Sequence, residues 1–378
     1  MPKTIGNAST LLVTLFAMSF LCSGSVAAGS SDRLVSPELL RHAGLKIVWE
    51  SELPIKHALS LPNGKAETLE QLTLLGERVY AISSRNYVVS MNKDTGKNVF
   101  SRKVAPEGFP ITGLVLYGDT ILCVGGSKLE ELDTESGARL RQVDVGFGIT
   151  APAARNSGFF YVAGTDNRMH VYRAEDCVQK FEAAAENDSI ITSIVADDDF
   201  VVFATDAGNV ISVAPDVPRR LWQFKASEGI AGEIVKDWMS LFFASEDTNV
   251  YRLDIVGLPE KTRLVWKYQA AAALERAPRV TQDVVYQPVR GKGITAIDKE
   301  TGSRLWRVPG GVELLAEAAG RAYVITEGEK LVVMDNVGTK RLYSVNFAEV
   351  TVYASNTGDG KFYIADKRGR VMCLKPVE

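Results

Sequence analysis

The sequence is poor in the residues from which many catalytic and metal sites are built. It contains three histidines (His42, His57 and His170) and four cysteines among its 378 residues. Imidazole and thiolate groups serve most often as zinc ligands, and imidazole is the commonest acid–base catalyst near neutral pH. No Ser-His-Asp grouping, HExxH helix, Walker loop or Rossmann glycine pattern stands out. The composition therefore argues against a hydrolytic enzyme.

An excess of either charge is also missing. Lys and Arg together number 43 and Asp and Glu 46, so the formal net charge is −3. This balance gives no electrostatic reason to expect nucleic acid or an anionic membrane surface as a partner. Hydrophobic residues make up 46% and charged residues 24%, which is typical of a soluble globular protein and excludes disorder and a multi-span membrane protein.

The one long hydrophobic run lies near the N-terminus, from Leu11 to Cys22, behind the single charge of Lys3. It has the length of a signal-peptide core and is short for a bilayer span. The small residues Val26-Ala27-Ala28 follow it and suit a signal peptidase. We therefore expect residues 1–28 to be a cleavable signal peptide and the mature chain to be periplasmic or otherwise exported, with no transmembrane span; a retained anchor is the alternative. Ser19-Phe20-Leu21 fits a lipoprotein signal poorly, so we expect no lipid on Cys22.

Removal of this segment leaves Cys123, Cys177 and Cys373, which are far apart and include no CxxC spacing. Cys123 (ILCV) and Cys373 (VMCL) lie in apolar runs, where a free cysteine usually packs as a small hydrophobic residue. We predict buried free thiols and no disulfide framework.

A repeat of about forty residues organises the chain after Leu72. In each unit an apolar strand ends at a turn rich in Asp and Gly. The residue that follows the third strand of each unit recurs at steps of 37 to 44, at Asn92, Asp133, Arg173, Ala214, Asp254, Asp298, Asp335 and Lys375. This regularity predicts eight copies of one structural unit.

Each unit is predicted to be all β. Arg78–Ser83 and Tyr87–Met91 are short runs rich in Val, Ile and Tyr, separated by turn residues. Asp94-Thr95-Gly96 and Glu300-Thr301-Gly302 supply the positive-φ residue that a hairpin into a fourth strand needs. Such small sheets must stack to bury their faces, and radial stacking gives an eight-bladed β-propeller. A linear β-solenoid is the alternative, but its repeats would be shorter, with one strand each.

The eighth unit stops after its third strand, at Glu378. The run from Leu45 to Glu50 resembles the missing fourth strand, because Trp49 matches Trp222, Trp266 and Trp306. We therefore expect this N-terminal strand to complete the last blade and close the ring. Residues 36–44 read as a short helix with a Ser cap and a Gly stop. The predicted organisation is a helix and linker over residues 29–44 and a single propeller over residues 45–378.

The segment IDKETGSRLW (Ile297–Trp306) resembles the pyrroloquinoline-quinone-type (PQQ-like) propeller repeat, and MNKDTGKNVF and LDTESGARLR repeat it less completely. The resemblance covers residues 45–378 and implies that its aromatic residues pack between blades. Enzymes of this type hold the quinone with a catalytic acid, calcium and, in many cases, adjacent cysteines. Here no cysteines are adjacent, and the acidic runs Asp197-Asp198-Asp199 and Glu186-Asn187-Asp188 are typical of solvated turns. We expect no cofactor and no metal.

In length and in the expected mode of closure the chain looks like the BamB family, whose members are scaffolds of the machine that assembles outer-membrane β-barrels. One partner-binding loop of that family reads Asp-x-Asp-Thr-Thr-Pro ahead of a blade's first strand. The matching stretch here is Ala273–Pro278, in which Glu275 and Pro278 agree while Ala273 and Arg276 depart. The resemblance implies that Leu274, Glu275 and Arg276 bind a partner; an ordinary loop between blades is the alternative.

Two functions are consistent with the sequence. The first is a noncatalytic, monomeric scaffold that binds protein partners of the cell envelope, possibly in outer-membrane protein assembly, and takes no cofactor. The second is a PQQ-dependent oxidoreductase or another propeller that binds a small molecule. For the first, we expect the charges of Glu275 and Arg276 to matter for recognition and little for folding.

Overall fold

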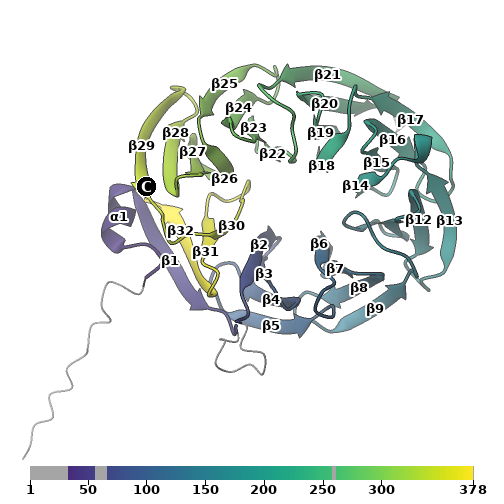
Figure 1. Ribbon diagram of the computed structural model, residues 1–378, viewed down its shortest axis with the longest axis horizontal. Coiled ribbons are helices and arrows are strands. Elements are labelled where there is room, and N and C mark those ends of the chain that lie inside the picture. The colour runs from purple at the N-terminus through teal and green to yellow at the C-terminus, as the bar shows by residue number, and fades with distance from the viewer. Residues whose placement is uncertain (1–32, 56–65, 258–260, 378) are drawn as a thin grey trace, which may run out of the picture. The chain divides into compact units, whose positions relative to one another are not determined.

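In the described part of the chain, eight four-stranded antiparallel sheets are arranged as the blades of a ring (Figure 1). The computed structural model describes residues 33–55, 66–257 and 261–377. Leu34–Glu378 forms one compact unit. The predicted eight-bladed propeller is therefore confirmed. The predicted signal peptide lies outside the described residues.

Each of the first seven blades uses four consecutive strands. Blade 1 consists of β2 (Leu69–Leu75), β3 (Arg78–Ser83), β4 (Tyr87–Asn92) and β5 (Asn98–Lys103). Blade 2 consists of β6 (Ile111–Tyr117), β7 (Thr120–Gly125), β8 (Lys128–Asp133) and β9 (Arg139–Asp144). Blade 3 consists of β10 (Ala154–Arg155), β11 (Phe159–Ala163), β12 (Arg168–Arg173) and β13 (Gln179–Ala184). Blade 4 consists of β14 (Ile191–Ala196), β15 (Val201–Thr205), β16 (Asn209–Val213) and β17 (Arg220–Lys225). Blade 5 consists of β18 (Ile230–Asp237), β19 (Ser240–Ser245), β20 (Asn249–Val256) and β21 (Lys261–Gln269). Blade 6 consists of β22 (Arg279–Val280), β23 (Val284–Val289), β24 (Gly293–Asp298) and β25 (Arg304–Val308). Blade 7 consists of β26 (Gly311–Ala318), β27 (Arg321–Thr326), β28 (Lys330–Asp335) and β29 (Lys340–Asn346).

The eighth blade joins the two ends of the ring. Its strands are β30 (Val352–Ala354), β31 (Phe362–Ala365), β32 (Arg370–Pro376) and, from the N-terminal side, β1 (Leu45–Glu52). β1 pairs antiparallel with β32, from Leu45 opposite Pro376 to Glu52 opposite Arg370. The predicted closure by an N-terminal strand is confirmed. Ahead of β1 lies the helix α1 (Pro37–His42), whose first turn is capped by the Ser36 hydroxyl.

The pairing register explains the regular spacing in the sequence. The residue that ends the third strand pairs with the first residue of the second strand, as in Arg78 with Asn92, Thr120 with Asp133 and Val284 with Asp298. Among the described residues, buried hydrophobic side chains form eight clusters, and each cluster lies between two neighbouring blades. The core is thus shared, because no single sheet could bury both of its faces alone.

A tryptophan on the outer strand of one blade packs on a glycine in the hairpin of the next. In blade 6, the Asp298 carboxylate accepts hydrogen bonds from the backbone N–H and the hydroxyl of Thr301, at 2.8 and 2.7 Å. Gly302 follows with φ of +71°. The Trp266 indole of blade 5 lies over Gly302 and donates a hydrogen bond to the carbonyl oxygen of Lys299, at 2.9 Å. This arrangement agrees with the expected role of the aromatic residues in packing between blades.

Within the described ranges, no helix is long and apolar enough to span a bilayer. The three described cysteines are free; Cys123 and Cys373 are buried, as predicted, and Cys177 is partly exposed.

Candidate functional site

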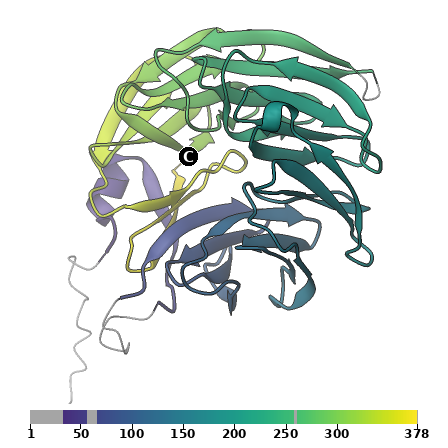
Figure 2. The same ribbon diagram turned by 45° about the vertical axis from the view of Figure 1, so that its right-hand side comes forward.

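The first strand of every blade lies nearest the axis of the ring, and the fourth strand forms the outer wall (Figures 1 and 2). Because all blades repeat one antiparallel order, the inner strands run in the same direction. We call the side on which they begin the start face and the side on which they end the end face. The predicted partner loop, Ala273–Pro278, leads into β22 and so belongs to the start face.

Leu274 anchors this loop in the core. Its side chain is fully buried between blades 5 and 6, with Phe242, Trp266 and Val289 in the same cluster. Direct contact with a partner is therefore not open to Leu274. The prediction that it belongs to a binding surface needs this correction, because its apolar side chain is held by the core that the two blades share.

Arg276 links two blades. Its guanidinium donates hydrogen bonds to the carbonyl oxygen of Val312, at 3.0 Å, and to the carboxylate of Glu313, at 2.6 Å. Glu313 is buried in β26, and Arg279 of β22 donates to both of its carboxylate oxygens, at 3.1 and 3.0 Å. A buried carboxylate that lost one of these partners would be costly. The structure therefore gives Arg276 a structural role that the sequence did not predict.

Charged and polar groups on the neighbouring inner strands influence the Arg279 and Glu313 pair. Burial lowers the pKa of Arg279, but the neighbouring Glu313 and Glu233 carboxylates outweigh it, so that the pKa of Arg279 is raised. Burial also raises the pKa of Tyr353 in β30, and the Glu313 carboxylate adds to this effect. Glu233 of blade 5 and Tyr353 of blade 8 are thus close enough to be influenced by the paired charges of Arg279 and Glu313. The sequence carries one signal for these charges: Glu313 and Glu317 interrupt a strand that is otherwise apolar.

Glu275 is exposed and, unlike Arg276, it pairs with an exposed residue and not with a buried one. Its carboxylate lies 3.2 Å from the guanidinium of Arg290, which follows β23, and both side chains are more than half exposed. Both residues also line a small cavity of about 160 Å³ with Arg276 and Glu327. An exposed pair of this kind contributes little to folding and exchanges partners readily. Glu275 and Arg290 are therefore available for contact on the start face.

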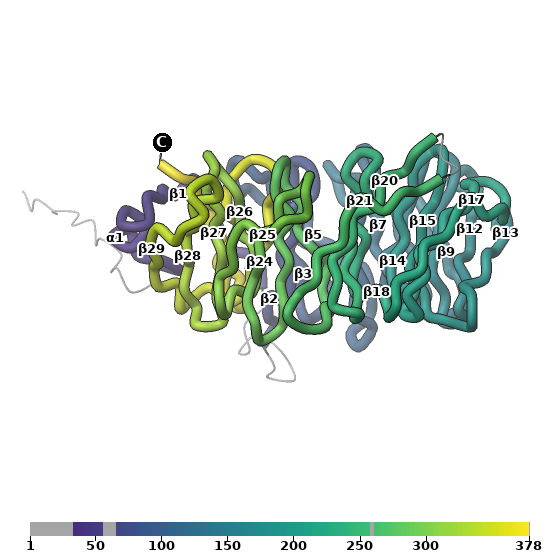
Figure 3. Tube along the Cα trace, turned by 90° about the horizontal axis from the view of Figure 1, so that it is seen from above, coloured from purple at the N-terminus to yellow at the C-terminus, as the bar shows by residue number. Residues whose placement is uncertain are grey.

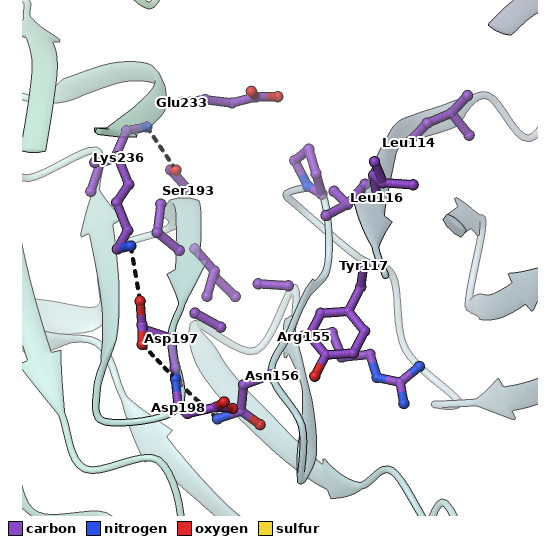
Figure 4. A pocket seen from close by; sticks show the side chains of 17 residues that line it. Leu114, Leu116, Tyr117, Arg155, Asn156, Ser193, Asp197, Asp198, Glu233 and Lys236 are labelled. Carbon is purple, nitrogen blue, oxygen red and sulfur yellow. Dashed lines mark hydrogen bonds and ion pairs between the residues drawn. The ribbon is translucent and has the colours of Figure 1, made fainter. Parts of the chain in front are cut away.

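A larger cavity of about 490 Å³ lies between the inner strands of blades 2 to 5 (Figure 4). Apolar side chains such as Leu114 and Ile194 line part of it. Arg155 projects beside Tyr117, with the guanidinium 4.6 Å from the ring centroid, and forms an ion pair with the buried Glu131. The cavity joins an apolar wall to charged groups, of which Arg155 is paired with Glu131 and Lys236 with Asp197.

One carboxylate of each acidic run considered for calcium forms an ion pair. Asp197 lies 2.9 Å from the Lys236 ammonium, and Asn156 donates a hydrogen bond to its carbonyl oxygen (Figure 4). Glu186 forms an ion pair with Arg220 and accepts a hydrogen bond from Gln223 at 2.6 Å. Within the described ranges, no group of three or more His, Cys, Asp or Glu side chains is placed to hold a metal ion. These residues do not bring together the ligands that calcium and a bound quinone would need.

Solved structures resemble this fold across most of its length. BamB from Moraxella catarrhalis is 15% identical, with a TM-score of 0.65 over 88% of this chain and 97% of that one. The computationally designed protein Ika8 is 13% identical, with a TM-score of 0.64 over 86% and 98%. The β-propeller domain of Cps50 (Swd1) from Myceliophteria thermophila is 14% identical, with a TM-score of 0.55 over 86% and 99%. At such identities these likenesses show the fold alone.

Sequence comparison supplies the family. No curated protein matches the chain. A family model described as "Outer membrane protein assembly factor BamB" matches residues 125–244 and 240–361, which together make up more than half of the sequence. The chain, a closed eight-bladed propeller, therefore belongs to the outer membrane protein assembly factor BamB family.

Proposed function

We propose that the protein is a noncatalytic, exported scaffold that binds a protein partner of the cell envelope during outer-membrane protein assembly. The observation that carries the proposal is the family match over residues 125–361. The chain's own residues support it, because the loop that aligns with the family's partner motif lies on the start face and presents Glu275. Export rests on the sequence of residues 1–28, which has the pattern of a signal peptide.

The geometry gives the residues of this loop different tasks. Leu274 fixes the loop in the core, and Arg276 ties it to Glu313 of the next blade. The loop is thereby held in one conformation before a partner arrives, which reduces the entropy that binding must overcome. Glu275 and Arg290 then meet the partner. A basic side chain of the partner can replace Arg290 beside Glu275, and an acidic one can replace Glu275 beside Arg290.

The proposal is tested by affinity capture from the envelope of cells that express the full chain with its own N-terminal residues. We expect Glu275→Ala combined with Arg290→Ala to reduce recovery of the captured envelope protein at least tenfold, while the melting curve stays unchanged. The matched control is Arg168→Ala combined with Glu182→Ala, an exposed ion pair between β12 and β13 of blade 3. Equal recovery by both double variants would place the partner surface elsewhere.

The competing function, a quinone-dependent oxidoreductase, is tested in the same preparation. A ligand that binds only the folded state must raise the melting temperature by mass action. We expect pyrroloquinoline quinone with calcium to leave the melting temperature unchanged. A rise of several degrees that grows with quinone concentration would favour the oxidoreductase.

A further inference from the structure

The outer wall of the ring has a groove at the junction of blades 6 and 7. It lies between β25 of blade 6 and β28 and β29 of blade 7, which are neighbours in the ring (Figures 1 and 3). Its volume is about 800 Å³, within the range of sites that hold a ligand or a short peptide. Its buried lining is apolar and consists of Trp306, Val308, Val332 and Met334.

The exposed lining of the groove is strongly basic. It includes the side chains of Arg304, Arg307, Lys330 and Arg341, with Glu327 as the one carboxylate among the lining residues that the structure describes. None of the four cations makes a side-chain hydrogen bond or an ion pair with another described residue.

Elsewhere many arginines are paired. Arg276 and Arg279 bind Glu313, and Arg290 binds Glu275. Four cations without counter-ions around an apolar floor attract negative charge from outside the chain. They do so on a protein whose net charge is −3, so the basic character is local.

The groove also has a direction and a length. Its lining runs from the turn that holds Thr326 and Gly328, along β28, to Thr339 at the start of the next strand. β28 has six residues, and a strand of that size is about 20 Å long. An extended segment of about six residues would therefore lie along β28 with its side chains alternating between the floor and the rim.

We propose that this groove binds an extended acidic segment of a protein partner. Acidic side chains of the segment pair with the cations of the rim, and one or two apolar side chains between them rest on the Trp306 and Met334 floor. A nucleic acid would need a longer basic surface that follows its phosphates. A lipid surface would need exposed apolar residues, whereas the apolar residues here are buried at the bottom of a groove. The groove meets the cavity beside Glu275 at Glu327, which lines both, but none of its four cations lines that cavity. The proposal does not rest on the proposed function.

The test uses the full chain and a fluorescein-labelled hexapeptide, Asp-Leu-Asp-Phe-Asp-Glu, in a fluorescence anisotropy titration. Arg304→Gln, Arg307→Gln, Lys330→Gln and Arg341→Gln are combined in one groove variant. The charge-matched control combines Lys46→Gln, Lys128→Gln, Lys180→Gln and Lys267→Gln, which remove exposed cations from blades 8, 2, 3 and 5. We expect the groove variant to lose affinity at least tenfold, since the modest contributions of four exposed ion pairs are removed together, and the control to change less than twofold.

Three results would overturn the proposal. The first is equal loss in the groove variant and the control, which would mean attraction without a site. The second is equal binding of a hexaglutamate peptide, which would mean that the apolar floor is not used. The third is binding to vesicles of phosphatidylglycerol without binding to the peptide, which would assign the cations to a lipid surface. If the groove variant fails to fold by circular dichroism, Arg304→Gln with Arg341→Gln replaces it, with an expected loss of about threefold.

Discussion

The indole of Trp49 lies on Gly96, across the junction between the last blade and the first. Its N–H donates a hydrogen bond to the carbonyl oxygen of Lys93, at 2.8 Å. Trp49 belongs to β1 and Gly96 to the hairpin between β4 and β5, so the strand that closes the ring is fixed on both sides: to β32 by the ladder and to blade 1 by this contact. Trp266 and Gly302 repeat the contact between blades 5 and 6.

Gly96→Ala is expected to lower the free energy of unfolding more than a glycine substitution that causes backbone strain but no steric overlap. Gly96 has φ of +67°, and an added Cβ would overlap the Trp49 ring. Gly118 has φ of +53° with no neighbour within 4 Å, so Gly118→Ala is the matched control. Positive φ costs about 1–3 kcal/mol in both, and overlap adds a similar amount in Gly96→Ala. Urea unfolding measures the difference; equal losses would show that the Trp49 contact yields without cost.

Deletion of residues 29–50 is expected to abolish cooperative thermal unfolding. The deletion removes most of β1 and exposes the edge of β32, which invites aggregation. Calorimetry and light scattering measure the two effects. Deletion of residues 29–32 alone, which leaves α1 and β1 in place, is the control. A deletion protein that melts like the full chain would contradict closure by β1.

Arg276→Ala is expected to destabilise the fold, whereas Glu275→Ala is expected to leave it nearly unchanged. Arg276 is about half exposed but serves the buried Glu313, so we expect a loss of about 1–3 kcal/mol on truncation. The Glu275 and Arg290 pair is exposed, and its loss should change stability by less than about 0.5 kcal/mol. Chemical denaturation of the two single variants tests this. Equal stability of both would remove the structural role of Arg276.

The hairpin aspartates are expected to make the fold sensitive to acid. Hydrogen bonds from Thr301 hold the pKa of Asp298 below its ordinary value. A carboxylate whose pKa is lower in the folded state stabilises the fold fully at pH values above its unfolded pKa of about 4. This stabilisation is lost as the pH falls through the folded-state pKa. Asp298→Asn should therefore flatten the decline of stability below about pH 4. Denaturation curves between pH 2 and 6 measure it, and an unchanged acid profile would contradict it.

The buried thiols are expected to be unreactive in the folded protein. Burial raises the pKa of Cys373 to about 12 and raises the pKa of Cys123 as well. Thiolates are the reactive species, so at pH 8 both cysteines should resist Ellman's reagent until denaturant is added. Cys177, which is partly exposed, serves as the internal comparison. Rapid labelling of Cys123 or Cys373 in the native protein would contradict the burial described here.

The ring was predictable because its information is local and repeated. Asn92, Asp133 and Asp298 each end a third strand and begin a hairpin, so their spacing reports the blade period directly. Trp49 could be matched to Trp266 because each lies on a hairpin glycine of the next blade and donates to a backbone carbonyl oxygen there. Trp306 also reaches the next blade, but it donates to the side-chain oxygen of Asn336.

The interactions of the site were not predictable, because they join residues of different blades. Nothing in a single sequence states that Glu313 lies beside Arg276, which is 37 residues earlier. The basic groove has the same origin: Arg304 and Arg341 belong to different sheets and become neighbours only when blades 6 and 7 pack. Leu274 was assigned to a surface because its loop resembles a binding loop, and burial is a property of the assembled ring.

The pairing of Leu45 with Pro376 also sets an order of events during synthesis. Blades 1 to 7 are built from consecutive strands, so the strands of each can pair as soon as its own residues emerge, and its faces are covered when the neighbouring blade follows. The last blade cannot form in this way, because its outer strand is made first and its partner strand is made last. A nascent chain therefore holds β1 without its partner for most of the time that translation takes. Chaperones that protect unpaired strands would be needed longest at this one strand, and release from them would coincide with completion of β32.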